Sequence, residues 1–390
     1  MPFTVYKPKP DMETKLEQTV DEKLSILRVS EPSLAGNELK YITECITTNW
    51  ISSQGKYVTE FENSMREFVG SQYALASASG TTALHLALAA LGLNSGDEVI
   101  VPDLTFAATA NVVVHCGAKP VFVDVTADTW TLDPGLIEAK ITDRTRAIIP
   151  VHLYGHPCDM EPIVKIAERH NLFVIEDVAE ALGAEYRGVP VGTIGDVGCF
   201  SFFANKVITT GEGGMLVTKD EVLYEKMALL ADHGMSKEKR YWHPVVGFNY
   251  RMTNLQAALG VAQMERIEHF LEVRREIAAT YKDGLNSLQG ISLVEPALWA
   301  TPVNWLYSIL IDASVTGIDR DRLAEELAVE GIETRPLFLP LHSQPPYAQD
   351  TGEYPVTEEL SNAGLSLPTS NGMSVEDAAR VSSIIAGIIQ

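Results

Sequence analysis

The chain has 390 residues, of which 46% are hydrophobic and 21% charged, a balance typical of a globular protein with a large core. Lysine and arginine number 30 against 52 aspartates and glutamates, a formal net charge of −22 that argues against nucleic acid or an anionic membrane as partner. An anionic small-molecule substrate stays compatible with this charge, because a binding site can gather arginines locally.

The cysteines and the apolar runs indicate the compartment. Four cysteines show neither paired nor metal-binding spacing, so we expect free thiols in a reducing environment: Cys45, Cys116, Cys158 and Cys199. No apolar run approaches the length of a membrane span, and no apolar secretory segment is visible near the N-terminus. The sequence therefore predicts a cytoplasmic protein without a membrane partner.

Short apolar runs alternate with helical patterns along much of the chain. We expect helices at about 36–48, 79–92, 105–116, 134–140 and 159–169, and strands near 73–76, 98–102, 121–125, 146–151, 173–176, 197–203 and 214–218. This alternation predicts an α/β fold with a mostly parallel, doubly wound sheet.

The later pattern differs, and we place a domain change near residue 250. Beyond it we expect some thirty helical residues from Thr253, a strand at 305–311, and helices at 320–330 and 375–389. The prediction is a large domain over residues 31–250 and a smaller α+β domain over 251–390. Residues 1–30, charged and with a helical pattern at 12–27, form an extension whose role is open.

Small and hydroxyl residues precede the helical pattern that begins near residue 79. Gly80 and Thr81 lie in this stretch, directly after Ser79. Free backbone N–H groups at a helix start, together with hydroxyls, form an anion site that suits a phosphate group. An ordinary serine cap with nothing bound is the alternative.

Two further residues lie just beyond expected strands. Phe106 follows the strand at 98–102 and could stack on a flat heteroaromatic ring, although a lone phenylalanine is more often part of the core. Asp177 follows the apolar run 173–175, where open α/β sheets place their ligands. Its carboxylate could pair with a pyridine nitrogen, or it could cap a helix.

Lys206 stands between apolar residues, five positions after Ser201 and just before a glycine-rich turn. Partial desolvation would lower the pKa of its amine. A lysine that is neutral near pH 7 can form a Schiff base with an aldehyde such as pyridoxal 5′-phosphate. The alternative is a surface lysine beside a tight turn.

The order of these features resembles the DegT/DnrJ/EryC1/StrS family of sugar-nucleotide aminotransferases, which have the fold-type I pyridoxal-phosphate architecture. The resemblance runs from about residue 31 to the C-terminus and includes 80–87, 96–102, 151–155, 210–214 and 249–258. It implies that Lys206 forms the internal aldimine, that Asp177 pairs with the pyridinium and that Phe106 stacks. It also places Gly80, Thr81 and Ser201 at the phosphate and Glu180 near the 3′-oxygen.

The resemblance further implies a homodimer with shared active sites, because Asn249 matches a family asparagine that reaches the phosphate of the neighbouring subunit. Substrate-binding roles follow for Trp50 and Ser52, and for Arg251 and Arg335 at a pyrophosphate. His342 could line the sugar pocket, or it could be structural. Both arginines could instead pair with carboxylates of this acidic chain.

Glu180 and the segments 240–242 and 331–336 resemble the members that aminate GDP-4-keto-6-deoxymannose with glutamate. A UDP- or dTDP-linked keto-sugar is the alternative substrate. A protein of this fold that binds the cofactor or a sugar nucleotide without transamination is the alternative class. Relatives that dehydrate replace the lysine with histidine, so Lys206 favours transamination.

Overall fold

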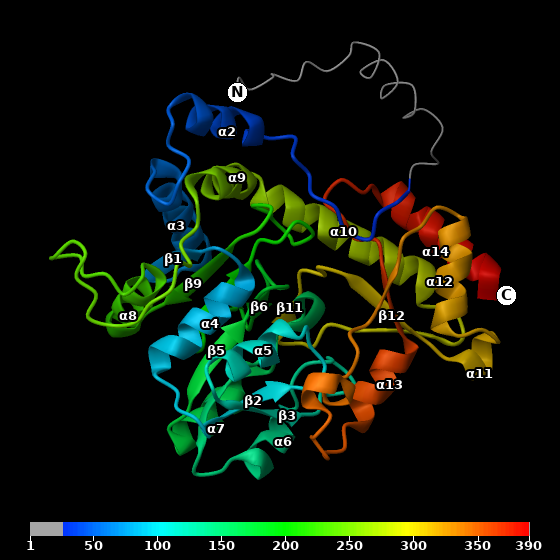
Figure 1. Ribbon diagram of the computed structural model, residues 1–390. Coiled ribbons are helices and arrows are strands. Elements are labelled where there is room, and N and C mark those ends of the chain that lie inside the picture. Colours follow the sequence, from blue (N-terminus) through cyan, green and yellow to red (C-terminus); the bar gives the residue numbers. More distant parts are fainter. Residues whose placement is uncertain (1–25, 390) are drawn as a thin grey trace, which may run out of the picture.

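The computed structural model describes residues 26–389, so almost all of the helical pattern at 12–27 lies outside the described residues. At its centre is a seven-stranded sheet in the order β1-β9-β8-β5-β4-β2-β3 (Figure 1). Its strands are β1 (Tyr73–Ser77), β2 (Glu98–Pro102), β3 (Lys119–Val123), β4 (Thr145–Ile148), β5 (Phe173–Asp177), β8 (Val197–Ser201) and β9 (Gly214–Thr218).

Most neighbours in this sheet are parallel, as predicted. Strands β3, β2, β4, β5 and β8 pair in parallel, whereas β9 runs antiparallel to both β8 and β1. Helices α4 (Gly80–Leu91), α5 (Ala108–His115), α6 (Pro134–Ile137) and α7 (Met160–His170) connect successive strands from β1 to β5, and α8 (Glu221–Ala231) follows β9. The alternating pattern of the sequence therefore folds as expected.

Successive residues of the strands point to opposite faces of the sheet, and each face is covered. Val99 and Val101 of β2 belong to the core beneath α4, α5 and α8, whereas Ile100 belongs to the core beneath α3 (Lys56–Val69), α7 and α9 (Asn254–Met264). Burial on both faces is why these strands read as continuous apolar runs rather than alternating ones. Helix α3 was missed by the sequence analysis, although its buried residues recur every fourth position.

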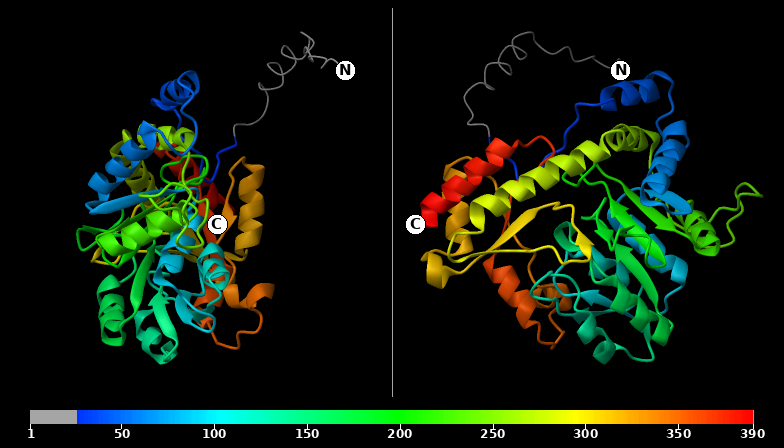
Figure 2. Two further views of the ribbon diagram at one scale, coloured as in Figure 1. Left: turned by 60° about the vertical axis from the view of Figure 1, so that its left-hand side comes forward. Right: turned by 180° about the vertical axis from the view of Figure 1, so that it is seen from behind.

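A second, antiparallel sheet lies in the C-terminal part of the chain, in the order β10-β12-β14-β13. Its strands are β10 (Ile291–Leu293), β12 (Tyr307–Ile311), β14 (Gly364–Leu367) and β13 (Arg335–Pro336). Helices α10 (Ile267–Leu285), α12 (Arg320–Val329) and α14 (Val375–Ile389) pack on it around a separate apolar core (Figure 2).

The remaining elements are short or peripheral. They are α2 (Glu38–Thr47), α11 (Ala313–Thr316), α13 (Pro355–Ala363), the strands β6 (Glu185–Tyr186), β7 (Val189–Pro190) and β11 (Ala300–Thr301), and the 3-10 turns η2 (Glu138–Lys140), η3 (Leu153–Gly155), η4 (Leu341–Ser343) and η5 (Pro345–Tyr347). Within residues 26–389, no helix combines the length and apolarity that crossing a membrane requires. The division into domains at residue 250 stays a prediction.

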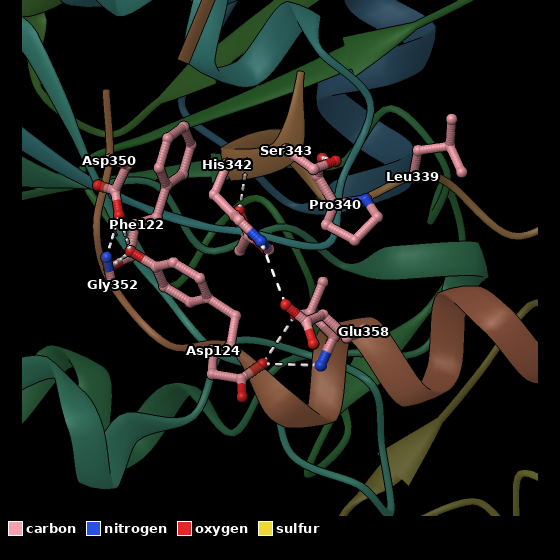
Figure 3. Close-up of polar contacts among 12 residues, drawn as sticks. Phe122, Asp124, Leu339, Pro340, His342, Ser343, Asp350, Gly352 and Glu358 are labelled. Carbon is pink, nitrogen blue, oxygen red and sulfur yellow. Dashed lines mark hydrogen bonds and ion pairs between the residues drawn. The ribbon is translucent and has the colours of Figure 1, made fainter. Parts of the chain in front are cut away.

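Two strand-end carboxylates attach the segment 339–358 to the large sheet, and Figure 3 shows one of them, Asp124, together with His342. Asp103, after β2, accepts hydrogen bonds from the backbone N–H of His342 (2.8 Å) and from its ring Nδ1 (2.6 Å). Asp124, after β3, accepts bonds from the N–H groups of Val356 and Thr357 at the start of α13. Segments from the C-terminal third are thereby fixed beside the carboxyl ends of β2 and β3.

Candidate active site

A cavity of about 420 Å³ lies at the carboxyl ends of β5 and β8. Asp177 is the last residue of β5, and Ser201 is the last residue of β8. The structure brings eight of the predicted site residues to the wall of this one cavity: Gly80, Thr81, Phe106, Asp177, Glu180, Ser201, Lys206 and Arg335. Such a position is where open α/β sheets bind ligands.

The start of α4 forms one end of the cavity. The side chain of Ser79 caps the helix by accepting the N–H of Thr82, so the N–H groups of Gly80 and Thr81 are left without an intrahelical acceptor. A Cβ atom at Gly80 would lie 2.6 Å from the Cβ of Ser201, so only glycine permits this close approach. The result is a cradle of N–H and hydroxyl groups at the positive end of a helix, which suits an anion.

Asp177 is buried in the cavity wall and keeps bonding capacity toward the cavity. Its Oδ2 accepts the hydroxyl of Thr109 at 2.9 Å, and its Oδ1 accepts the N–H of Ala179 at 3.1 Å. Burial raises the pKa of this carboxyl, and those two hydrogen bonds and the charge of Lys206 oppose the rise. No helix begins at Asp177, so the alternative of a helix cap is not realised.

Lys206 reaches the same cavity with a side chain that is only 13% exposed. Its Nζ lies 3.4 Å from Oε1 of Glu180 and 3.5 Å from the centre of the Trp305 ring. Burial lowers the pKa of the amine, whereas the charges of Glu180 and Asp177 oppose the fall. The lysine is therefore a largely buried amine with a carboxylate nearby, and the alternative of a surface lysine is not realised.

Glu180 is held beside the lysine by the backbone. Its Oε2 accepts the N–H of Tyr154 at 2.8 Å, and burial raises the pKa of its carboxyl against the opposing charge of Lys206. Phe106 is 59% exposed and so is not a core residue, which leaves its ring free to contact a ligand in the cavity.

Several wall residues were not expected from the sequence, among them Thr109, Asn205, Trp305 and Phe338. Thr109 lies in the first turn of α5, three residues after Phe106, so a strand-end argument extended by one turn could have found it. Trp305 lies 100 residues after Asn205, in the segment just before β12. No local pattern joins these two positions.

Two predicted substrate residues, Trp50 and Ser52, do not line this cavity. Both belong to the loop before α3, and Trp50 is 58% exposed beside a separate hollow. Their carbonyl groups accept bonds from the side chain and the backbone N–H of Asn254. In this single chain they shape the loop rather than the cavity.

Three other predicted residues also lie outside the cavity wall. Arg251 pairs with Asp232 at 3.0 Å, and Asn249 is exposed next to it, bridged to Asp232 through the backbone. His342 is bound to Asp103 as described above, so the structure gives this histidine the structural role that was the alternative. Arg335 does line the cavity, with Glu333 at 3.6 Å.

The chain belongs to the DegT/DnrJ/EryC1/StrS aminotransferase family, whose model matches residues 32–386. Proteins named GDP-perosamine synthase are similar to it over most of their length. The one from Caulobacter vibrioides is 49% identical over 91% of this chain and 96% of its own, and the one from Escherichia coli O157:H7 is 47% identical over 90% and 96%.

Solved structures agree with this membership. An aminotransferase from Psychrobacter cryohalolentis superposes with a TM-score of 0.88 at 32% identity, covering 92% of this chain and 98% of its own. Helicobacter pylori PseC, an aminotransferase involved in the biosynthesis of pseudoaminic acid, has a TM-score of 0.88 at 30% identity, covering 93% and 99%. The predicted family and α/β fold are thereby confirmed.

Proposed function

We propose that this protein is a pyridoxal-phosphate-dependent aminotransferase that uses glutamate to aminate GDP-4-keto-6-deoxymannose at C4, giving GDP-perosamine. The observation that carries the reaction type is one cavity that holds an amine, Lys206, a buried carboxylate, Asp177, and the anion cradle at Gly80. The choice of nucleotide rests on the relatives named GDP-perosamine synthase, which are 42–49% identical.

The residues present fit the cofactor. Gly80, Thr81 and Ser201 would hold its phosphate, since a Cβ at position 80 would fill the cradle that they form. Phe106 would cover its ring, and Asp177 would face its ring nitrogen. When bound, the cofactor supplies an electron-accepting ring that stabilises negative charge on the carbon that loses its proton.

Lys206 has two tasks in this proposal. Its Nζ would hold the cofactor through the aldehyde carbon, and as a free amine it would take a proton from the substrate and return it to the neighbouring carbon. A base works best with a pKa near the operating pH, and burial lowers the pKa of Lys206 in that direction. Asp177 would contribute a fixed negative charge at the ring nitrogen.

Arg335 would bind the pyrophosphate of the sugar nucleotide, because its planar fork can donate to two oxygens at once. It lies in the cavity wall and keeps only a 3.6 Å pair with Glu333. Arg251 pairs with Asp232 and does not line the cavity, so Arg335 is the arginine that we assign to the pyrophosphate.

A homodimer with shared sites is part of the proposal. Asn249 is exposed at the base of the segment 233–250, which projects from the body beside α8 (Figure 1). Mixing inactive Lys206→Ala subunits with inactive Asn249→Ala subunits should restore activity, since one of the two sites in a heterodimer would be intact. Absence of rescue after confirmed subunit exchange would contradict the shared site.

The substrate is tested by incubating the protein and glutamate with GDP-, UDP- and dTDP-linked 4-keto-6-deoxysugars. The products are then identified by mass spectrometry. We expect the amino sugar from the GDP compound. A dTDP-linked substrate is the second candidate, because DesI, solved in the presence of its TDP-sugar product, is 33% identical with a TM-score of 0.87. Amination of a UDP or dTDP compound at least tenfold more efficiently would overturn the nucleotide and leave the reaction type standing.

The reaction type has its own test. The bound cofactor should absorb in the visible, and glutamate should bleach that band. A protein that binds the cofactor but shows no bleaching with glutamate would be a non-transaminating member of the family.

A further inference from the structure

The amine of Lys206 lies between two groups that have different origins in the chain. On one side is Oε1 of Glu180, at 3.4 Å, and on the other is the face of Trp305, with 3.5 Å between Nζ and the ring centre. An aromatic face attracts a cation through its quadrupole, most strongly for tryptophan and where water is excluded. The same face offers nothing comparable to a neutral amine.

Trp305 is fixed in this position from several directions. Its ring N–H donates to the carbonyl of Asn205, the residue before the lysine, at 2.6 Å. Its own carbonyl accepts a bond of 2.8 Å from the guanidinium of the buried Arg274. Its ring also stacks on that of Tyr154, whose N–H holds Glu180. The indole and the carboxylate are therefore parts of one rigid arrangement around the amine.

We propose that Trp305 is a positioning residue, which together with Glu180 holds the ammonium of Lys206 whenever the lysine is not attached to the cofactor. The inference rests on the proposed function. In the glutamate half-reaction the substrate leaves as 2-oxoglutarate, one water supplies its keto oxygen, the amino group stays on the cofactor, and Lys206 is left as a free amine. Because Glu180 and Trp305 bind the free ammonium, they stabilise the enzyme with its lysine released over the enzyme with its lysine attached to the cofactor.

The other charged groups that face the amine do not replace the indole. The charge of Asp177 adds attraction, and the charge of Arg335, which also lines the cavity, repels the ammonium. Removing the ring therefore leaves Glu180 as the one contact below 4 Å that favours the charged lysine among the described residues. The balance between attached and free lysine should then move toward attachment.

The test measures an equilibrium rather than a rate. The holoenzyme is titrated with mixtures of glutamate and 2-oxoglutarate, without sugar nucleotide, and the ratio that bleaches half of the visible band is recorded. Trp305→Leu should raise this ratio about tenfold, and Trp305→Phe, which keeps a weaker aromatic face, about threefold. The shift should shrink as the pH is raised, because a neutral amine is not attracted to the ring.

Trp299→Phe is the matched control, since Trp299 is a partly buried tryptophan that packs on His156 and Tyr186 and does not line the cavity, and its ratio should equal the wild-type value. If Trp305→Leu does not load cofactor, Trp305→Phe decides. A wild-type ratio in a loaded Trp305 variant, or a shift that does not depend on pH, overturns the inference and leaves the proposed function intact. A wild-type protein that glutamate cannot bleach overturns both.

Discussion

Arg274 and Lys206 are both largely enclosed by this fold, and their surroundings differ. Arg274 is 0% exposed and donates to neutral oxygens only: the side chain of Asn371 at 2.8 Å and the carbonyl groups of Trp305 and Thr369 at 2.8 Å each. Lys206 keeps 13% of its side chain exposed, has a carboxylate at 3.4 Å and faces a cavity. Burial lowers the pKa of Arg274 to about 9, so its guanidinium is charged at neutral pH.

The difference separates a structural group from a reactive one. The Nε and Nη1 groups of Arg274 donate to buried oxygens beside the second sheet, and moving the side chain would leave those acceptors without partners. The amine of Lys206 has only a long contact with Glu180 and the face of the Trp305 ring, so it can exchange these partners for a ligand at a small cost in free energy. The neighbours Glu176 and Asp177 repeat the contrast, since Glu176 accepts four bonds and Asp177 accepts two while lining the cavity.

The largest effect is expected from Lys206→Ala. The variant should fold, because the lost side chain lines a cavity, and its turnover should fall by about 10⁴-fold or more, since both the attachment point and the base are removed. Turnover is measured as amino sugar formed, and circular dichroism checks the fold. Activity within tenfold of the wild type would show that Lys206 is a structural residue, as Arg274 is, and not the reactive amine.

Asp177→Asn should come next. The variant keeps the shape of the side chain and loses its negative charge, so we expect turnover to fall by about 10²–10³-fold, or 2.7–4 kcal/mol by analogy with other electrostatic stabilisers. Cofactor absorption confirms loading. A variant that keeps more than about a tenth of the wild-type rate, a loss under about 1.4 kcal/mol, would show that Asp177 acts as a structural carboxylate.

Arg274→Met should affect stability first. The carbonyl groups of Trp305 and Thr369 and the side chain of Asn371 would lose their donor, so the free energy of unfolding should fall by about 3 kcal/mol in urea titration. Lys206→Met is the matched control and should leave that free energy unchanged or higher. Equal stability of the two variants would remove the distinction between the two cations.

Glu176→Gln tests the role of the fully hydrogen-bonded carboxylate, through the pH dependence of the free energy of unfolding. Burial would raise the pKa of Glu176, but the bonds from His152, Gly192 and Gly195 more than offset it, so the folded pKa lies below the ordinary 4.5. A depressed pKa adds stability above the unfolded value that is lost as pH falls through the folded one. The variant should therefore be less stable by about 2 kcal/mol at pH 7, and the gap should narrow below about pH 4.5. A gap that does not vary with pH would contradict this assignment.

Much of the site could be predicted because its residues sit at ends of strands and helices. Gly80, Phe106, Asp177 and Ser201 follow apolar runs that read as buried strands or precede a helical pattern, and parallel strands bring their carboxyl ends to one edge. Lys206 was marked by its apolar flanks. Wall residues that reach the cavity from distant segments, above all Trp305, could not be predicted from local patterns.

Sequence alone determined the alternation of strands and helices, the family and the set of groups at the strand ends, because periodicity and order along the chain are local properties. The tertiary structure decided which cations and aromatics meet those groups. Arg335 enters from β13 of the second sheet and Trp305 from the segment just before β12. His342 and Arg251 are instead bound outside the cavity by Asp103 and Asp232. Contacts between distant segments depend on how two cores pack, and no spacing rule encodes that packing.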